Sequence, residues 1–290
     1  RDRIPSALAS KVVPDPVRQR ILQEYDLQGV VTGLESVYQD AVVETLRREM
    51  PVIMYHRFIE HESEKGVHGT WLPVAMFEKH LKLMKWLGYE TLTFADLAEN
   101  GFIHRLQYGK KYLMITVDDG YRDNLTRMLP LLEKYGYKAV VYVVTGEDHN
   151  RWDVEHPTHP DTPVTLMTPD EIKALVASGH VEIGGHTLTH PRLSTLPPGE
   201  QAHQIQANKA WLEQLLGHPL ISFAYPYGDL NDSAKSQAVA AGYRYAVATN
   251  SGPRAMHRDP FQIRRIAIFP RTDMFGLWRK IRGNYVFRKT

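Results

Sequence analysis

Two adjacent carboxylates, Asp118 and Asp119, stand in the segment Thr-Val-Asp-Asp-Gly at residues 116–120. They follow an apolar run at residues 112–117, which is typical of a buried strand. Neighbouring side chains of an extended backbone point to opposite sides. One Asp could therefore bind a cation while the other faces a bound water. An ordinary Asp-Asp-Gly turn would fit the same residues.

A histidine pair is the second candidate. His186 and His190 lie four residues apart, after two glycines and before Pro191. The flanking Gly and Pro favour a strand-to-helix loop over a continuous helix. Because this loop also follows an apolar run, we expect it at the same end of a parallel sheet as Asp119. Two imidazoles and one carboxylate leave a position open on a metal, which is typical of catalytic zinc sites. Two surface histidines are the alternative.

Two further segments place functional groups where strands should end. His56 follows the run at residues 52–55, and histidine is a natural proton donor near neutral pH. The segment Tyr-Pro-Tyr-Gly at residues 225–228 predicts a tight loop whose aromatic rings could flank a sugar. Taken alone, a strand-end histidine and a simple turn would explain both segments.

The elements that must position these residues alternate along the chain. Short apolar runs alternate with amphipathic helical patterns such as residues 74–87. Five helical patterns end at a glycine that is followed by a β-prone run, which predicts parallel strands with crossover helices. About seven strands favour an α/β barrel over an open sheet. The runs are residues 52–55, 112–117, 139–144, 181–183, 221–225, 245–248 and 263–269, and the glycines are Gly88, Gly136, Gly179, Gly217 and Gly242.

Composition and charge exclude several classes of protein. The 290 residues carry a formal net charge of +2, so we expect no nucleic-acid partner. The absence of Cys excludes disulfides and thiolate chemistry. No apolar run approaches the roughly 18 residues of a membrane span. We expect two parts, a helical extension over residues 1–50 and a barrel domain over residues 51–290.

The C-terminal segment is basic. Residues 254–290 contain ten Lys or Arg and only two acidic residues. Within this segment, residues 273–283 have the pattern of a short basic amphipathic helix. It could contact an anionic membrane or cell wall, and a terminal helix docked on the barrel is the favoured alternative.

Together these motifs resemble those of the polysaccharide deacetylase family (NodB homology, carbohydrate esterase family 4). Residues 116–120 resemble its Thr-Phe-Asp-Asp-Gly motif, with Val117 in place of Phe, and residues 186–190 resemble its His-Ser/Thr-x-x-His motif. Residues 225–228 resemble the third motif. The similarity covers about residues 51–270 in the same order. The early Tyr-His resembles the subgroup that acts on the biofilm polymer poly-β-1,6-N-acetylglucosamine.

The resemblance implies a metal-dependent N-deacetylase on a distorted (β/α) barrel with seven parallel strands. Carried over to this sequence, Asp118 is the catalytic base and the backbone N–H of Tyr227 helps to hold the oxyanion. His56 takes the role of the acid. One divalent metal ion is implied, with zinc preferred over cobalt or nickel. Its ligands would be Asp119, His186 and His190.

The sequence also departs from the family pattern. Ala224 stands where many members have an Arg that steadies the base, and no Leu-x-His motif supplies the acid. Arg264 or Arg265 is expected to replace the missing Arg beside Asp118.

The implied substrate is an amino-sugar polymer, and the implied location is extracellular or at a bacterial cell envelope, although this chain shows no signal sequence. Tyr121, Tyr225 and Trp152 are candidates to stack on sugar rings. Chitin oligomers or peptidoglycan are alternative substrates for the same chemistry. A non-catalytic carbohydrate-binding protein on the same fold is an alternative of a different class.

Overall fold

The computed structural model describes residues 50–99, 110–283 and 285–286, together with residues 16, 20 and 32–33. The chain divides into two compact units, Arg1–Thr45 and Leu46–Thr290, and the fold below is that of the second. The helical extension expected over residues 1–50 falls almost entirely outside the described residues. Within the described ranges, no helix combines the length and apolar character that crossing a bilayer requires.

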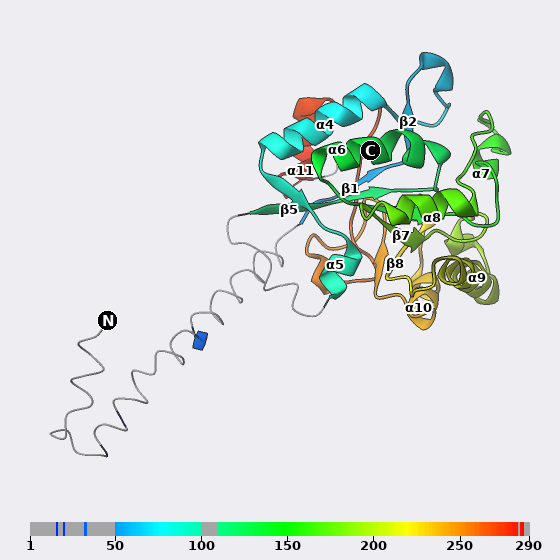
Figure 1. Ribbon diagram of the computed structural model, residues 1–290. Helices are drawn as coiled ribbons and strands as arrows, with labels where there is room; N and C mark the ends of the chain where they lie inside the picture. The colour runs from blue at the N-terminus through cyan, green and yellow to red at the C-terminus, as the bar shows by residue number, and fades with distance from the viewer. Residues whose placement is uncertain are drawn as a thin grey trace. The chain divides into compact units, whose positions relative to one another are not determined.

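A curled sheet of parallel strands forms the centre of the second unit (Figure 1). Seven strands pair in the order β10-β1-β5-β6-β7-β8-β9, and β4 adds to the first half of β5. Each of the seven predicted runs overlaps one of these seven strands, so the predicted barrel strands are confirmed. The bounds are β1 Val52–Tyr55, β4 Tyr89–Thr91, β5 Lys111–Val117, β6 Ala139–Val143, β7 Val181–Gly185, β8 Ser222–Ala224, β9 Tyr245–Val247 and β10 Ile266–Ala267. A separate small sheet pairs β2 Arg57–Ile59 with β3 Trp71–Pro73.

The segment that leads into β10 connects the two ends of the sheet. Ile263 hydrogen-bonds on both sides of Val247 in β9, through the N–H of Ala248 and the carbonyl of Ala246. Three residues later, Ile266 pairs with Ile53 of β1. The strands therefore curl into a distorted (β/α) barrel, with this segment along its seam.

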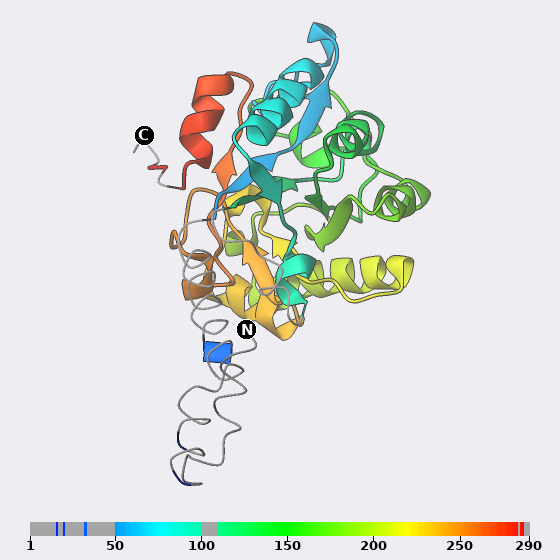
Figure 2. The same cartoon turned by 60° about the vertical axis from the view of Figure 1, so that its left-hand side comes forward.

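Helices surround the strands (Figure 2). All five predicted helix-ending glycines have positive φ, which confirms that they stop the preceding helix. The helices are α4 Val74–Trp86, α5 Phe94–Ala98, α6 Leu129–Tyr135, α7 Arg151–Val154, α8 Pro169–Ala177, α9 Pro198–Leu216, α10 Asp232–Ala240 and α11 Met274–Ile281. Single turns are η1 Glu62–Glu64, η3 Asn124–Met128, η4 Leu193–Thr195, η5 Pro226–Gly228 and η6 Met256–Arg258.

Local capping fixes where two of these helices begin. At α8, the Thr168 side chain accepts from the N–H of Glu171, and the Glu171 carboxylate accepts from the N–H of Thr168. Pro169 occupies the first helical position. At α11, the Asp273 side chain accepts from the N–H of Gly276. The start of α8 is therefore fixed by the side chains of its own first turn.

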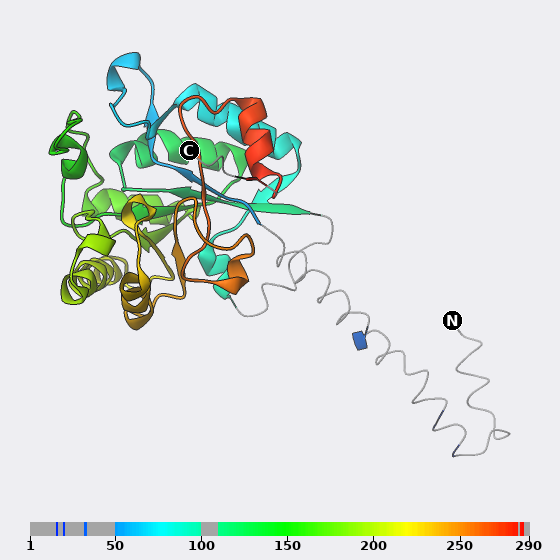
Figure 3. The same cartoon turned by 180° about the vertical axis from the view of Figure 1, so that it is seen from behind.

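The basic C-terminal helix α11 docks on the barrel beside α4 (Figure 3). Leu277 and Ile281 are fully buried, whereas Phe275 is 62% exposed. Burying a Leu or Ile side chain stabilises a fold by about 1.5–3 kcal/mol. The structure therefore shows the docked arrangement of this helix, and it leaves a second, outward face.

Candidate active site

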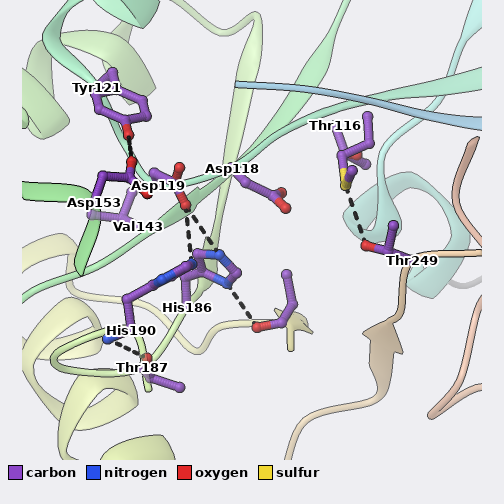
Figure 4. Close-up of polar contacts among 12 residues, drawn as sticks. Thr116, Asp118, Asp119, Tyr121, Val143, Asp153, His186, Thr187, His190 and Thr249 are labelled. Carbon is purple, nitrogen blue, oxygen red and sulfur yellow. Dashed lines mark hydrogen bonds and ion pairs between the residues drawn. The ribbon is translucent and has the colours of Figure 1, made fainter. Parts of the chain in front are cut away.

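Three groups able to bind a metal meet at the C-terminal ends of β5 and β7 (Figure 4). The Nε2 atoms of His186 and His190 lie 3.3 and 3.4 Å from Oδ1 of Asp119. All three side chains are buried, and their ligand atoms lie within 4.8 Å of one another. The fold thus brings together the carboxylate and the two imidazoles that the sequence singled out, and we call these three residues the triad.

The backbone that carries the triad is strained. Asp119, Thr187 and His190 have φ angles of 76°, 69° and 58°, in the left-handed region that non-glycine residues rarely adopt. Gly120 follows with φ 81°, and a Cβ there would lie 3.2 Å from the side chain of Val143. Such strain persists only where the surrounding structure enforces it, and it concentrates at functional sites.

The protonation states of the triad fit a divalent cation. Nδ1 of His186 lies 2.7 Å from the carbonyl oxygen of Ala224, which can only accept, so the Nε2 lone pair is left for the triad. Burial lowers the pKa of His190 to about 3, which keeps its imidazole neutral. Burial raises the pKa of Asp119, but His186, His190 and His56 together lower it by more, so the pKa lies below its ordinary value. Oδ1 of Asp119 is buried, and it has no hydrogen-bond partner among the described residues.

A buried arginine holds the neighbouring carboxylate. Two nitrogens of Arg265 donate to the two oxygens of Asp118 at 2.5 and 2.7 Å, and its Nε donates to the carbonyl of Ala248 at 3.0 Å. Such a bidentate ion pair fixes the orientation of the carboxylate and also balances its charge. Burial raises the pKa of Asp118, but the charge and hydrogen bonds of Arg265, together with the nearby His186 and His56, lower it by more, so the carboxylate is ionised at neutral pH. Of the two arginines proposed for this place, Arg265 occupies it, and Arg264 donates to the carbonyl of Tyr285 instead.

Two aromatic rings and a histidine border the triad. The rings of Trp152 and Tyr227 lie 4.3 and 4.5 Å from the ring of His190, and Tyr227 is 44% exposed. His56 is half-buried at the end of β1, and its carbonyl accepts from Nδ2 of Asn124 at 2.9 Å. Trp152 and Tyr227 therefore flank His190, and His56 is close enough to act electrostatically on Asp118 and Asp119.

Two aromatic residues proposed to stack on sugars do not have an accessible ring. Tyr121 and Tyr225 are both fully buried. The hydroxyl of Tyr121 donates to Asp153 at 3.4 Å, and that of Tyr225 donates to the carbonyl of Phe261 at 3.0 Å. We therefore correct their expected role, because neither ring is accessible to a sugar.

Sequence reasoning missed three buried amides near the site. Asn124 contacts the carbonyl of His56, while Gln204 and Asn208 of α9 contact the loop that carries the two triad histidines. Their only signal in the sequence is the spacing of four between Gln204 and Asn208, which places both on one face of a helix.

Comparison with known proteins agrees with this geometry. A family model described as polysaccharide deacetylase matches residues 105–246, a range that includes the whole triad. The chain carries a polysaccharide deacetylase domain. The domain is therefore a hydrolase, and its (β/α) barrel is the fold of that family.

Several curated relatives resemble the deacetylase domain. YxkH of Bacillus subtilis (strain 168), named for the same family, is 27% identical over 222 residues, which cover 77% of this chain and 72% of that protein. The peptidoglycan-N-acetylglucosamine deacetylase of Bacillus cereus is 27% identical over 59% of this chain and 49% of its own length. The poly-β-1,6-N-acetyl-D-glucosamine N-deacetylase of Staphylococcus aureus is 22% identical, over 71% of this chain and 70% of that protein.

A solved structure gives the same result. The deacetylase PplD of Streptococcus pyogenes, in complex with acetate, superposes with a TM-score of 0.65 at 25% identity. The match covers 80% of this chain and 98% of that one. The similarity extends over nearly the whole barrel, so it includes the strands that carry the site.

Proposed function

We propose that this chain is a metal-dependent N-deacetylase that removes acetyl groups from the N-acetylglucosamine units of an extracellular polymer, poly-β-1,6-N-acetylglucosamine. One observation carries the proposal: Asp118, ionised and held by Arg265, is adjacent in the chain to a ligand of the triad. Binding alone requires no ionised carboxylate beside a cation, whereas hydrolysis requires a base there.

The triad residues Asp119, His186 and His190 would hold the metal, with zinc as the preferred ion because a mixed nitrogen and oxygen set of three is typical of catalytic zinc. When bound, a divalent cation supplies Lewis acidity toward the acetamido carbonyl and lowers the pKa of water. Cobalt and nickel also accept such ligands.

The residues of the chain would act as follows. Asp118 accepts a proton from water as the oxygen of that water attacks the acetamido carbon. The N–H of Tyr227 donates a hydrogen bond to the developing oxyanion, a contribution that is commonly worth about a hundredfold or more in rate. His56 gives a proton to the amine nitrogen as the C–N bond breaks, and the products are acetate and a glucosamine unit.

The choice of polymer is supported by the early His56 and by the Staphylococcus aureus relative. The Bacillus cereus relative, which is named for peptidoglycan, has the higher identity and favours peptidoglycan as the second candidate. Measuring acetate release from poly-β-1,6-N-acetylglucosamine, peptidoglycan and chitin oligomers distinguishes the candidates. We expect the highest kcat/KM for the first of them.

Metal dependence gives the first prediction. The purified chain is expected to bind about one zinc ion, to lose acetate release when a chelator removes it, and to recover activity when zinc is added. His190→Ala removes one ligand and should abolish both zinc binding and turnover, because two ligands hold the ion weakly. His218→Ala, at an exposed histidine, is the matched control. Full activity in metal-free protein would exclude this mechanism.

We also propose that the outward face of α11 rests on an anionic surface at the cell envelope. The exposed ring of Phe275 stacks on Trp278 at 5.5 Å, and Arg282 lies over Trp278 at 4.5 Å. Exposed aromatics beside basic residues are typical of membrane-interface helices.

Vesicle binding tests this second prediction. The chain should sediment with vesicles that contain anionic lipid and not with purely zwitterionic ones, and salt should weaken the binding. Phe275→Ser should reduce binding several-fold, whereas Val239→Ser, at an exposed apolar residue of α10, should not. Equal binding by both variants would contradict a role for α11.

A further inference from the structure

The buried face of α9 is unusually polar. Its buried residues are Gln201, Gln204, Ile205, Asn208 and Leu212. A helix that only covered a barrel would carry apolar residues at these positions. A buried amide destabilises a fold unless it is hydrogen-bonded. The partners of these amides therefore indicate why they are present.

Asn208 is fully buried and connects three segments. Its Oδ1 accepts from the N–H of His186 at 3.1 Å. Its Nδ2 donates to the carbonyl of Thr187 at 2.7 Å and to the carbonyl of Val143 at 3.0 Å. One side chain thus ties the backbone of a triad ligand to the end of β6.

Gln204 lies one helical turn earlier and holds the middle of the same loop. Its Oε1 accepts from the N–H groups of Leu188 and Thr189, both at 3.1 Å. Its Nε2 donates to Oγ1 of Thr189 at 3.0 Å. The two amides together therefore bind three of the backbone N–H groups between His186 and Thr189.

The absence of a side chain at Gly185 allows α9 to lie close to the loop. A Cβ at Gly185 would lie 2.7 Å from Oδ1 of Asn208 and 2.1 Å from the hydroxyl of Tyr243. The loop itself turns through left-handed residues at Thr187 and His190, where the N–H of His190 bonds to Oγ1 of Thr187. The loop has no regular secondary structure to fix this strained path, so side chains must do so.

We propose that Gln204 and Asn208 are positioning residues that hold His186 and His190 in the geometry needed for the cation before the cation arrives. This inference rests on the proposed metal-dependent deacetylation. Hydrogen bonds that neighbouring residues make to the metal ligands commonly account for about tenfold to a hundredfold in metal affinity. Here those bonds reach the ligands through the backbone.

The test compares substitutions at Gln204 by their zinc affinity, measured by competition with a chromophoric chelator. Gln204→Met keeps the volume and removes the acceptor, and it should weaken zinc binding about tenfold or more. Gln204→Glu keeps the acceptor for Leu188 and Thr189, and the Thr189 hydroxyl can donate in return. It should bind zinc within about threefold of the unaltered chain.

Gln201→Met is the matched control. Gln201 is also a buried amide on the same helix, but its Nε2 donates to the carbonyls of Leu193 and Leu196, outside the histidine loop. It should lower Tm and leave zinc affinity unchanged. If Gln204→Met lowered only Tm, with zinc affinity equal to that of Gln201→Met, the positioning role would be overturned.

Amide hydrogen exchange of the metal-free chain provides a test without any substitution. The N–H groups of Leu188 and Thr189 should be protected before zinc is added, and exchange at the rate of an open loop would contradict the inference. If the unaltered chain bound no zinc at all, the proposed function would fail together with this inference. Zinc binding with an unprotected loop would overturn the inference alone.

Discussion

Asp118→Asn is expected to lower kcat for acetate release by about a hundredfold to ten-thousandfold, which is the usual contribution of a general base. The asparagine side chain has nearly the same shape but cannot accept a proton at neutral pH. Zinc content should remain close to one per chain, because the three ligands of the triad are unchanged. Single-turnover acetate release and metal analysis of the same preparation measure both quantities.

A half-buried carboxyl elsewhere in the barrel supplies the control for that experiment. Glu182 of β7 accepts from the N–H of Ala95 at 2.7 Å and takes no part in the site. Glu182→Gln makes the same chemical change and should leave kcat within about twofold, as expected for a residue outside the chemistry. A kcat for Asp118→Asn equal to that of Glu182→Gln would mean that another group is the base.

The largest effect on stability is expected at Arg265. Arg265→Met leaves Asp118 buried without its partner, and breaking a buried ion pair in this way costs about 3–5 kcal/mol. Arg264→Met, at the neighbouring half-buried arginine, should cost about 1 kcal/mol or less. Urea denaturation of the metal-free proteins measures both values.

The double variant separates charge from packing. If the loss in Arg265→Met comes from the unpaired carboxylate, then adding Asp118→Asn should restore part of the free energy of unfolding. Additive losses, with no restoration, would show instead that Arg265 stabilises the fold through its other contacts, such as the carbonyl of Ala248.

The strands and the triad could be predicted because each depends on a local pattern. An apolar run followed by a polar group defines a strand end, and parallel strands bring their C-terminal ends together. Asp119 and His186 each lie within two residues of the end of such a strand, and His190 belongs to the same short loop as His186, so the sequence predicts that the three groups meet. β4 was missed because its three residues, Tyr-Glu-Thr, give no apolar run.

Other features depend on three-dimensional packing. Arg264 and Arg265 are flanked by Ile263 and Ile266, both of which are buried, so the alternation of the strand does not show which arginine points inward. Tyr121 follows the Asp-Asp-Gly segment and Tyr225 opens the Tyr-Pro-Tyr-Gly segment, and these positions do not distinguish a rim aromatic from a core one. Gln204 was overlooked because a helix is identified by its apolar residues, and α9 has few of them on its buried face.

The seam of the barrel has a consequence for when the enzyme becomes competent during synthesis. The stretch that begins at Ile263 bridges β9 to β1 and also carries Arg265, the counter-charge of Asp118. A nascent polypeptide that has emerged only as far as β9 would contain the triad ligands, yet its proposed base would have no cationic partner. The closure of the barrel and the pairing of Asp118 with Arg265 therefore take place together, late in synthesis. A chain shortened before this stretch would lack both.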